Sequence, residues 1–283
     1  MTYFRTRHVI GIALALGACG GNGTNKSAPD APAAMPDASG PPNLTLTTQG
    51  SLGARLVDSQ GKTLYFFAND IAGSNASTYS GAAWPVFDVQ TPIVGEGLSA
   101  SDFGRFDRGG GAFQTTWKGR PLYYYANDTS AAPTAGEGIG GRWFVARAYD
   151  LFFGANSTVT PQGSTAADAP FLTDGAGRTL YVYAADTRGV SGGAPTSACG
   201  TGCLAHWPLW PAPASLTGLA LPSTVQAANL TSFTNTNASQ SQFVYLGWPL
   251  YYYATDTSAG EVAGASIPSW YTASPGWNGT MTQ

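Results

Sequence analysis

The chain has 283 residues, and its hydrophobic and aromatic residues, at 43% and 12%, supply enough apolar material for one large or two small domains. Charged residues make up only 10%, whereas glycines and prolines number 37 and 19, which favours short strands and turns over helices. The formal net charge is −3 and no clustered basic run occurs, so a nucleic-acid partner is disfavoured.

Residues 1–18 have the organisation of a bacterial signal peptide. Two arginines open it, an apolar run too short to span a bilayer follows over residues 9–16, and two small residues precede Cys19. The sequence Leu-Gly-Ala-Cys at 16–19 resembles the lipobox of secreted lipoproteins, which implies lipidation of Cys19, with palmitate among the acyl chains. The alternative is an ordinary signal peptide with a chance cysteine. We expect a lipid-anchored protein of the cell envelope, in the outer membrane if the host is Gram-negative, because Gly20 follows the cysteine.

Residues 19–44 carry no feature of a folded segment. Gly20 to Pro42 contain neither aromatic nor β-branched apolar residues, so this stretch cannot bury enough surface to offset its ordering entropy. The sequence therefore predicts a flexible, lipidated tether.

A seven-residue pattern recurs four times beyond the tether, at residues 64–70, 122–128, 180–186 and 250–256. Its aromatic and aspartate positions are Tyr65, Phe67 and Asp70; Tyr123, Tyr125 and Asp128; Tyr181, Tyr183 and Asp186; and Tyr251, Tyr253 and Asp256. The segments that precede the copies alternate between two types, which indicates the duplication of a two-copy unit. We predict a first unit at residues 45–152 and a second at 165–275, joined by a polar run.

Each copy is predicted to form a β-hairpin. Asp58 to Gly61 and Asp174 to Gly177 have the aspartate and glycine that a type I turn with a bulge requires. Pro121 and Pro249 stand where a strand begins, the place at which a missing N–H disrupts least. Both faces of the strand that follows are apolar, so the strands should be covered on both sides. The predicted fold is all-β, with two duplicated units that resemble a sandwich or a closed sheet.

These residues resemble the secreted lipoproteins named for a Tyr-x-(Phe/Trp/Tyr)-x-x-Asp motif, a repeat family of unknown function. Trp84-Pro85 and Trp207-Pro208 follow the motif in the family's order, and Gly138 to Trp143 is similar to its Gly-Gly-x-Trp ending. Residues 265–270 depart from that ending in the glycines. The resemblance implies secretion and a β-repeat fold, and it brings no reaction, cofactor or catalytic residue.

The four motif aspartates allow two interpretations. As calcium ligands they would need further carboxylates at alternate positions, and none recur. As turn residues they would accept backbone N–H groups at the end of a strand, which is the interpretation we favour.

Cys199 and Cys203 also allow two interpretations. With His206 they could bind copper or zinc, although no fourth ligand is evident. In the first unit both cysteines are replaced together, by Ala76 and Ser80, as expected of a bonded pair. A disulfide is therefore favoured, and the paired cysteines before Trp-Pro are similar to those of the family.

The inventory for catalysis is poor. Outside the signal peptide His206 is the only histidine, and neither a nucleophile elbow nor a phosphate loop occurs. We expect no catalytic residue, metal or cofactor, and a non-catalytic module that binds an unknown envelope protein or glycan. The alternatives are a redox or copper-associated accessory protein that uses Cys199 and Cys203, and an envelope hydrolase.

Overall fold

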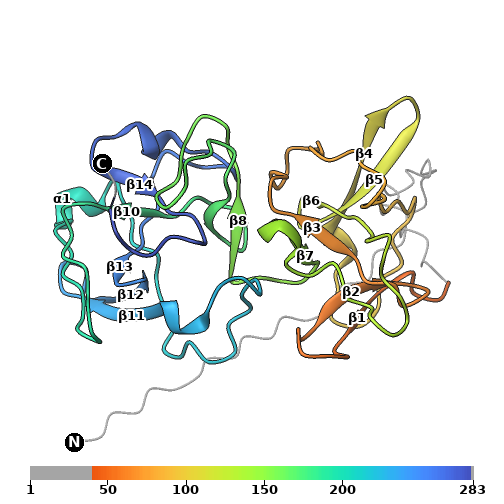
Figure 1. Ribbon diagram of the computed structural model, residues 1–283, viewed down its shortest axis with the longest axis horizontal. Helices are drawn as coiled ribbons and strands as arrows, with labels where there is room; N and C mark the ends of the chain where they lie inside the picture. Colours follow the sequence, from red (N-terminus) through yellow and green to blue (C-terminus); the bar gives the residue numbers. More distant parts are fainter. Residues whose placement is uncertain (1–39, 282–283) are drawn as a thin grey trace, which may run out of the picture. The chain divides into compact units, whose positions relative to one another are not determined.

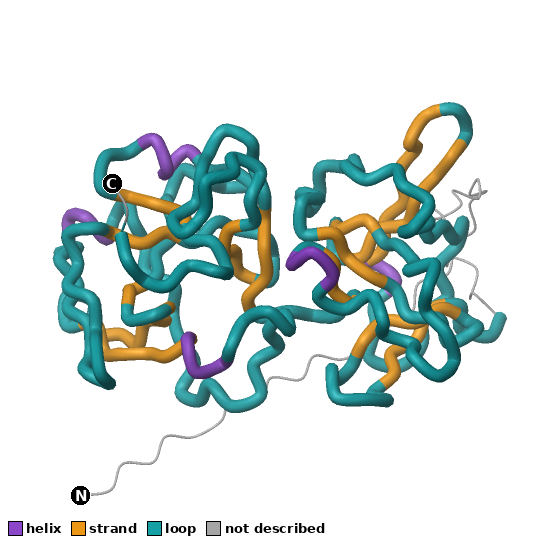
Figure 2. The backbone as a smooth tube through the Cα atoms, viewed as in Figure 1, coloured by secondary structure: helices purple, strands orange, loops and turns teal. Residues whose placement is uncertain are grey.

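Short antiparallel strands joined by long loops make up the part of the chain that the computed structural model describes, residues 40–281 (Figure 1 and Figure 2). The predicted all-β class is confirmed, since helices are limited to a few turns within those residues. The predicted signal peptide and Cys19 lie outside the described residues.

The strands fall into two series of seven within the described chain. The first series is β1 (Leu44–Thr47), β2 (Arg55–Asp58), β3 (Tyr65–Phe67), β4 (Phe103–Gly109), β5 (Ala112–Trp117), β6 (Arg120–Pro121) and β7 (Trp143–Val145). The second series is β8 (Leu151–Gly154), β9 (Phe171–Asp174), β10 (Tyr181–Tyr183), β11 (Leu230–Asn235), β12 (Gln240–Tyr245), β13 (Trp248–Pro249) and β14 (Trp270–Thr272). The helical turns are η1 (Ala100–Asp102), η2 (Ile139–Gly141), α1 (Thr201–Leu204), η3 (Ala227–Asn229) and η4 (Ala263–Ser266).

The two series pair their strands in the same way, which confirms the duplication. In the first unit β1 pairs with β2, β3 with β7, and β4, β5 and β6 form a three-stranded sheet. In the second unit β8 pairs with β9, β10 with β14, and β11, β12 and β13 form the three-stranded sheet. All of these strand pairs are antiparallel.

The strand pairing places the start of each unit earlier than the sequence boundaries at 45 and 165. Leu44 is fully buried and begins β1, and the carbonyl of Ile93 accepts its N–H at 3.2 Å. Strand β8 relates to β9 as β1 relates to β2, so residues 151–154 group with the second unit. The polar run from Gly154 to Asp168, which was expected to join the units, then lies inside the second unit, where Gly154 ends β8 and residues 155–168 belong to a loop.

Two turn types build the hairpins. Gly61, with φ of 76°, donates its N–H to the carbonyl of Asp58 at 3.0 Å, as the predicted bulged turn requires. Between β5 and β6, Lys118 and Gly119 both have positive φ, 50° and 75°, which is the conformation of a type I′ turn. The second unit repeats this turn at residues 246–247, with φ of 52° and 87°.

The two faces of each motif strand enter different apolar clusters. Leu64 and Phe66 pack into a cluster that contains residues of both units, whereas Tyr65 and Phe67 pack around Trp84 in a cluster confined to the first unit. The second unit repeats this division around Trp207. The expectation that the strands are covered on both sides is therefore confirmed.

Candidate functional site

The tyrosines and aspartates of the two motif copies in the first unit bond reciprocally. The hydroxyl of Tyr65 donates to Asp128 Oδ2 at 2.7 Å, and the hydroxyl of Tyr123 donates to Asp70 Oδ2 at 2.6 Å. The backbones cross at the same place, because Tyr65 and Tyr123 each donate an N–H to the other's carbonyl. Each copy thus supplies the donor for the carboxylate of the other copy.

The second unit contains the same pair of bonds. The hydroxyl of Tyr181 donates to Asp256 Oδ2 at 2.5 Å, and that of Tyr251 donates to Asp186 Oδ2 at 2.8 Å. We call these four contacts the Tyr–Asp pairs. They bring together eight of the twelve motif residues singled out in the sequence.

The second oxygens of three aspartates accept backbone N–H groups from downstream loops. Asp70 Oδ1 accepts from Thr78 at 2.7 Å, Asp186 Oδ1 from Ala198 at 2.8 Å, and Asp256 Oδ1 from Ala263 at 3.1 Å. An Asx turn would take its N–H from two residues ahead. Here the donors lie 7 to 12 residues ahead, so each carboxylate closes a loop.

Two motif copies contain three consecutive tyrosines, residues 123–125 and 251–253, which we call the tyrosine triplets. The middle tyrosine of each triplet bonds to a hairpin turn. The hydroxyl of Tyr124 donates to Asp58 Oδ2 at 2.8 Å, and that of Tyr252 donates to Asp174 Oδ2 at 3.0 Å. Asp58 Oδ1 meanwhile accepts two N–H groups of its own turn. Each tyrosine triplet is therefore bonded both to the other motif copy of its unit and to the hairpin turn that precedes that copy.

Four aromatic rings stack in a row inside each unit. In the first unit the order is Tyr125, Trp84, Trp143, Phe67, with ring centroids 4.4, 3.8 and 4.3 Å apart. In the second unit the order is Tyr253, Trp207, Trp270, Tyr183, with centroids 4.4, 3.6 and 4.2 Å apart. The two tryptophans are parallel within 2° in both units. We call each row the aromatic stack, and it contains the other four motif residues.

Two glycines that the sequence reasoning missed lie against these rings. A Cβ on Gly136 would approach Trp84 and Tyr65 to within 2.9 Å, and one on Gly264 would approach Tyr181 and Trp207 to the same extent. A side chain would displace the tyrosine from its aspartate. The signal was present in the sequence as Ala-Gly at 135–136 and 263–264, seven residues after an aspartate.

Burial controls the electrostatics of the Tyr–Asp pairs. It raises the pKa of Asp70, Asp128 and Asp256 above the ordinary range, and it raises the pKa of Asp186 to about 6. The tyrosine hydroxyl bonds act in the opposite direction and lower each of these pKa values. Three of the four carboxylates are at most 5% exposed, so the pairs act inside the protein as structural bonds.

The other candidate residues of the sequence lie in the second unit. Cys199 and Cys203 form a disulfide with Cα atoms 5.1 Å apart, and Cys199 packs under Trp207. His206 is exposed at the end of the short helix α1. Within residues 40–281 no cluster of three or more His, Cys, Asp or Glu side chains is placed to hold a metal ion.

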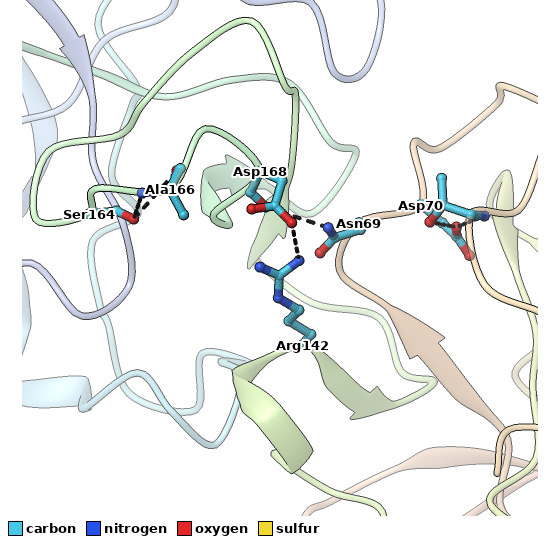
Figure 3. A network of polar contacts seen from close by, with 7 residues as sticks. Asn69, Asp70, Arg142, Ser164, Ala166 and Asp168 are labelled. Carbon is cyan, nitrogen blue, oxygen red and sulfur yellow. Dashed lines mark hydrogen bonds and ion pairs between the residues drawn. The ribbon is translucent and has the colours of Figure 1, made fainter. Parts of the chain in front are cut away.

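A further polar network joins residues of the two units. Arg142 Nη1 lies 3.3 Å from Asp168 Oδ2, and the amide of Asn69 donates to the carbonyl of Asp168 at 3.5 Å, as Figure 3 shows. The Asp168 side chain is 63% exposed, so solvent screens this ion pair and its contribution to stability is small. Figure 3 also shows Asp70 turned away from this network, into the first unit.

An open cavity of about 980 Å³ lies on the first unit beside β1 and β2, and we call it the first-unit groove. Its volume is that of a small-molecule site. Aromatic, hydroxyl, amide and cationic side chains line it, among them Thr45, Arg55, Gln60, Lys62, Tyr124 and Tyr125. Tyr125 ends the aromatic stack, with one face against Trp84 and its ring only partly buried. Gln60 and Lys62 are exposed in this groove, so their polar groups can meet a ligand from solvent.

Comparison with known proteins confirms the expected family. Residues 46–88 and 104–147 each match the family described as a secreted repeat of unknown function. The two matches contain the first and second motif copies, so both matched repeats lie in the first unit, and the similarity to a secreted repeat implies an extracytoplasmic protein. Neither a curated protein nor a solved structure matches the chain. Among residues 40–281 no helix is both long enough and apolar enough to cross a membrane.

Proposed function

We propose that the protein is a lipid-anchored, non-catalytic binding module of the bacterial cell envelope. Acylated Cys19 holds it on a membrane, the outer one in a Gram-negative host. Its β units stand away from the membrane on the tether and meet an envelope protein or glycan. The secreted-repeat match and the leader that precedes Cys19 support this placement.

The internal use of the motif's polar groups is the observation that carries the proposal. The four hydroxyls of Tyr65, Tyr123, Tyr181 and Tyr251 donate to motif carboxylates, and three of those carboxylates also close loops. Groups bonded in this way build a rigid scaffold and are not available to a substrate. The open groove on the first unit is then the surface that such a scaffold would present.

Crosslinking in intact cells tests the binding role. A photoreactive residue at Gln60, which is exposed in the first-unit groove, should give a discrete crosslinked product. Ala176 is the exposed residue at the corresponding position of the second unit and provides the matched control. A ladder of equal products at both positions, or no product at Gln60, would count against a specific binding surface there.

Fractionation tests the anchor. Cys19→Ser should abolish acylation and release the protein from membranes, because Cys19 is the cysteine that directly follows the leader. Mass spectrometry of the wild type should show acyl chains on Cys19. Retention of the variant in the membrane fraction at the wild-type level would overturn the anchor.

A further inference from the structure

The position of the first-unit groove is filled by protein in the second unit. The strand registers place Phe152 where the groove has Thr45, and Phe171 where it has Arg55. Both phenylalanines are completely buried. The guanidinium of Arg120, from the first unit, lies 4.5 Å from the centroid of the Phe152 ring. This position in the fold is therefore one that already receives a side chain from outside its own unit.

Further contacts close the second unit over the same position. Arg178, the counterpart of Lys62, donates to the carbonyls of Tyr253 and Asp256, each at 3.3 Å. The N–H of Gly260 donates to the carbonyl of Gly177 at 3.1 Å, so the loop that follows Asp256 contacts the hairpin turn that ends at Gly177. In the first unit Lys62 is exposed, with Nζ 5.8 Å from the centroid of the Tyr124 ring, and the groove stays open.

The first unit has polar and basic residues where the second unit has phenylalanines, so the open groove is polar and cationic. Arg55 is 2% exposed, and its Nε donates to Thr63 Oγ1 at 3.1 Å while its Nη1 donates to the carbonyl of Gln49. Within residues 40–281 no carboxylate lies within 4.0 Å of the Arg55 or Lys62 nitrogens. Asp128 also lines the groove, but its Oδ2 accepts the Tyr65 hydroxyl. The Asp128 carboxylate interacts electrostatically with buried Arg55, so exposed Lys62 leaves the groove with a net positive charge, which an anionic ligand would complement.

The remaining lining indicates what carries the negative charge. Tyr125 has one ring face supported by Trp84 and lines the groove, so it can pack against the C–H face of a pyranose ring. Thr45, Gln60 and Thr129 offer hydroxyl and amide groups that can pair with sugar hydroxyls. Flat aromatic surface, neutral hydrogen-bonding groups and the exposed cation of Lys62 together match sugar rings that carry carboxylates.

We propose that the first-unit groove binds an acidic glycan, a chain of pyranose rings bearing carboxylates. This inference rests on the proposed binding function and names its ligand class. Such a glycan could come from the cell wall, where lactyl groups without a stem peptide carry the carboxylates, or from a uronic-acid polysaccharide. Lys62 would attract a carboxylate, and Tyr125 would position a ring.

Calorimetric titration of the full mature chain in detergent tests the ligand class. Three probes are compared: a glycan strand of alternating N-acetylglucosamine and N-acetylmuramic acid, a hexamer of galacturonic acid, and a neutral hexamer of glucose. We expect at least one acidic probe to bind ten times more tightly than the neutral one, with affinity falling as salt rises. The preferred acidic probe identifies the source. Equal binding of all three probes, or binding of none, would overturn the inference.

Matched variants locate the binding. Lys62→Gln changes an exposed side chain and should weaken acidic binding about tenfold, and Tyr125→Leu should do the same. Tyr253→Leu makes the corresponding change in the second unit and should leave affinity unchanged. Loss of binding in Tyr253→Leu but not in the groove variants would refute the site.

The crosslinking experiment separates the two levels of inference. A protein captured at Gln60, together with no binding of acidic glycans, would retain the binding module and reject the glycan. Absence of both a crosslinked product and glycan binding would reject both proposals.

Discussion

Replacing Tyr123 by phenylalanine removes one hydroxyl from the interior and leaves Asp70 without that donor. The bond is 2.6 Å long, and Asp70 is 1% exposed, so water cannot take the place of the hydroxyl. A hydrogen bond to a charged group contributes roughly 1.5–3 kcal/mol, so we expect a loss of about 2 kcal/mol of unfolding free energy at neutral pH. For a folded part of this size the melting temperature should fall by roughly 4–8 °C.

The pH dependence of this loss identifies its cause. Burial raises the pKa of Asp70 and the Tyr123 hydroxyl lowers it, so Tyr123→Phe raises that pKa further. As the pH falls through this raised pKa the carboxyl of the folded state takes up a proton, and the variant then loses only a neutral bond of about 1 kcal/mol. The destabilisation should therefore be larger at pH 7 than at pH 4 when both are measured by urea unfolding.

Tyr183→Phe is the matched control, because Phe67 already stands at the corresponding position of the first unit. This variant keeps the ring of the aromatic stack and should unfold within about 0.5 kcal/mol of the wild type. Equal losses in Tyr123→Phe and Tyr183→Phe, or a loss in Tyr123→Phe that does not change with pH, would refute the role assigned to the Tyr–Asp pair.

Three further predictions use the same unfolding measurements. Burial raises the pKa of Asp186 to about 6, so its contribution to the unfolding free energy should decline as the pH rises from about 4 to 6. Asp186→Asn should flatten this dependence of the unfolding free energy on pH. Parallel pH dependences of wild type and variant would contradict the prediction. Burial lowers the pKa of Arg120 to about 10, and its Nη2 has no hydrogen-bond partner. The unfolding free energy of Arg120→Met should therefore remain within about 1 kcal/mol of the wild type. A loss above about 2 kcal/mol would show that the charge itself is needed. Replacing Cys199 and Cys203 together by alanine should lower the unfolding free energy by about 2 kcal/mol. Free thiols at both positions, found by alkylation mass spectrometry of the purified protein, would favour the redox alternative.

The elements that the sequence predicted best are those whose signal is local. The aspartate and glycine of the Asp58 to Gly61 turn, and the apolar pattern on both faces of the motif strands, indicated hairpins that are covered on both sides. The sequence boundary at residue 152 divides strand β8, because Leu151 to Gly154 follows the first unit directly in the chain. Its partner β9 lies beyond a loop of 16 residues, from 155 to 170, and no local pattern identifies such a pairing.

The reciprocal bonds of the Tyr–Asp pairs could not be predicted from one motif copy. Tyr65 and Asp128 are 63 residues apart, and Tyr181 and Asp256 are 75 apart. A motif that contains both a tyrosine and an aspartate suggests a contact within itself, whereas the extended strand carries them to separate partners. The repeat held the information only in the sense that equal copies can bond to each other symmetrically.

Reciprocity explains why the repeat occurs in pairs. A single copy would bury an aspartate with no tyrosine hydroxyl and a tyrosine with no acceptor, and each such group costs roughly 1–3 kcal/mol or more. It would also lack the second tryptophan, since Trp84 of one copy stacks on Trp143 of the other at 3.8 Å. The smallest set of copies that satisfies these groups is therefore two, and the family matches at 46–88 and 104–147 each contain one of them. Both units keep this closure while the side chains on β1 and β2 differ from those on β8 and β9, which opens the groove on one unit and fills the position on the other.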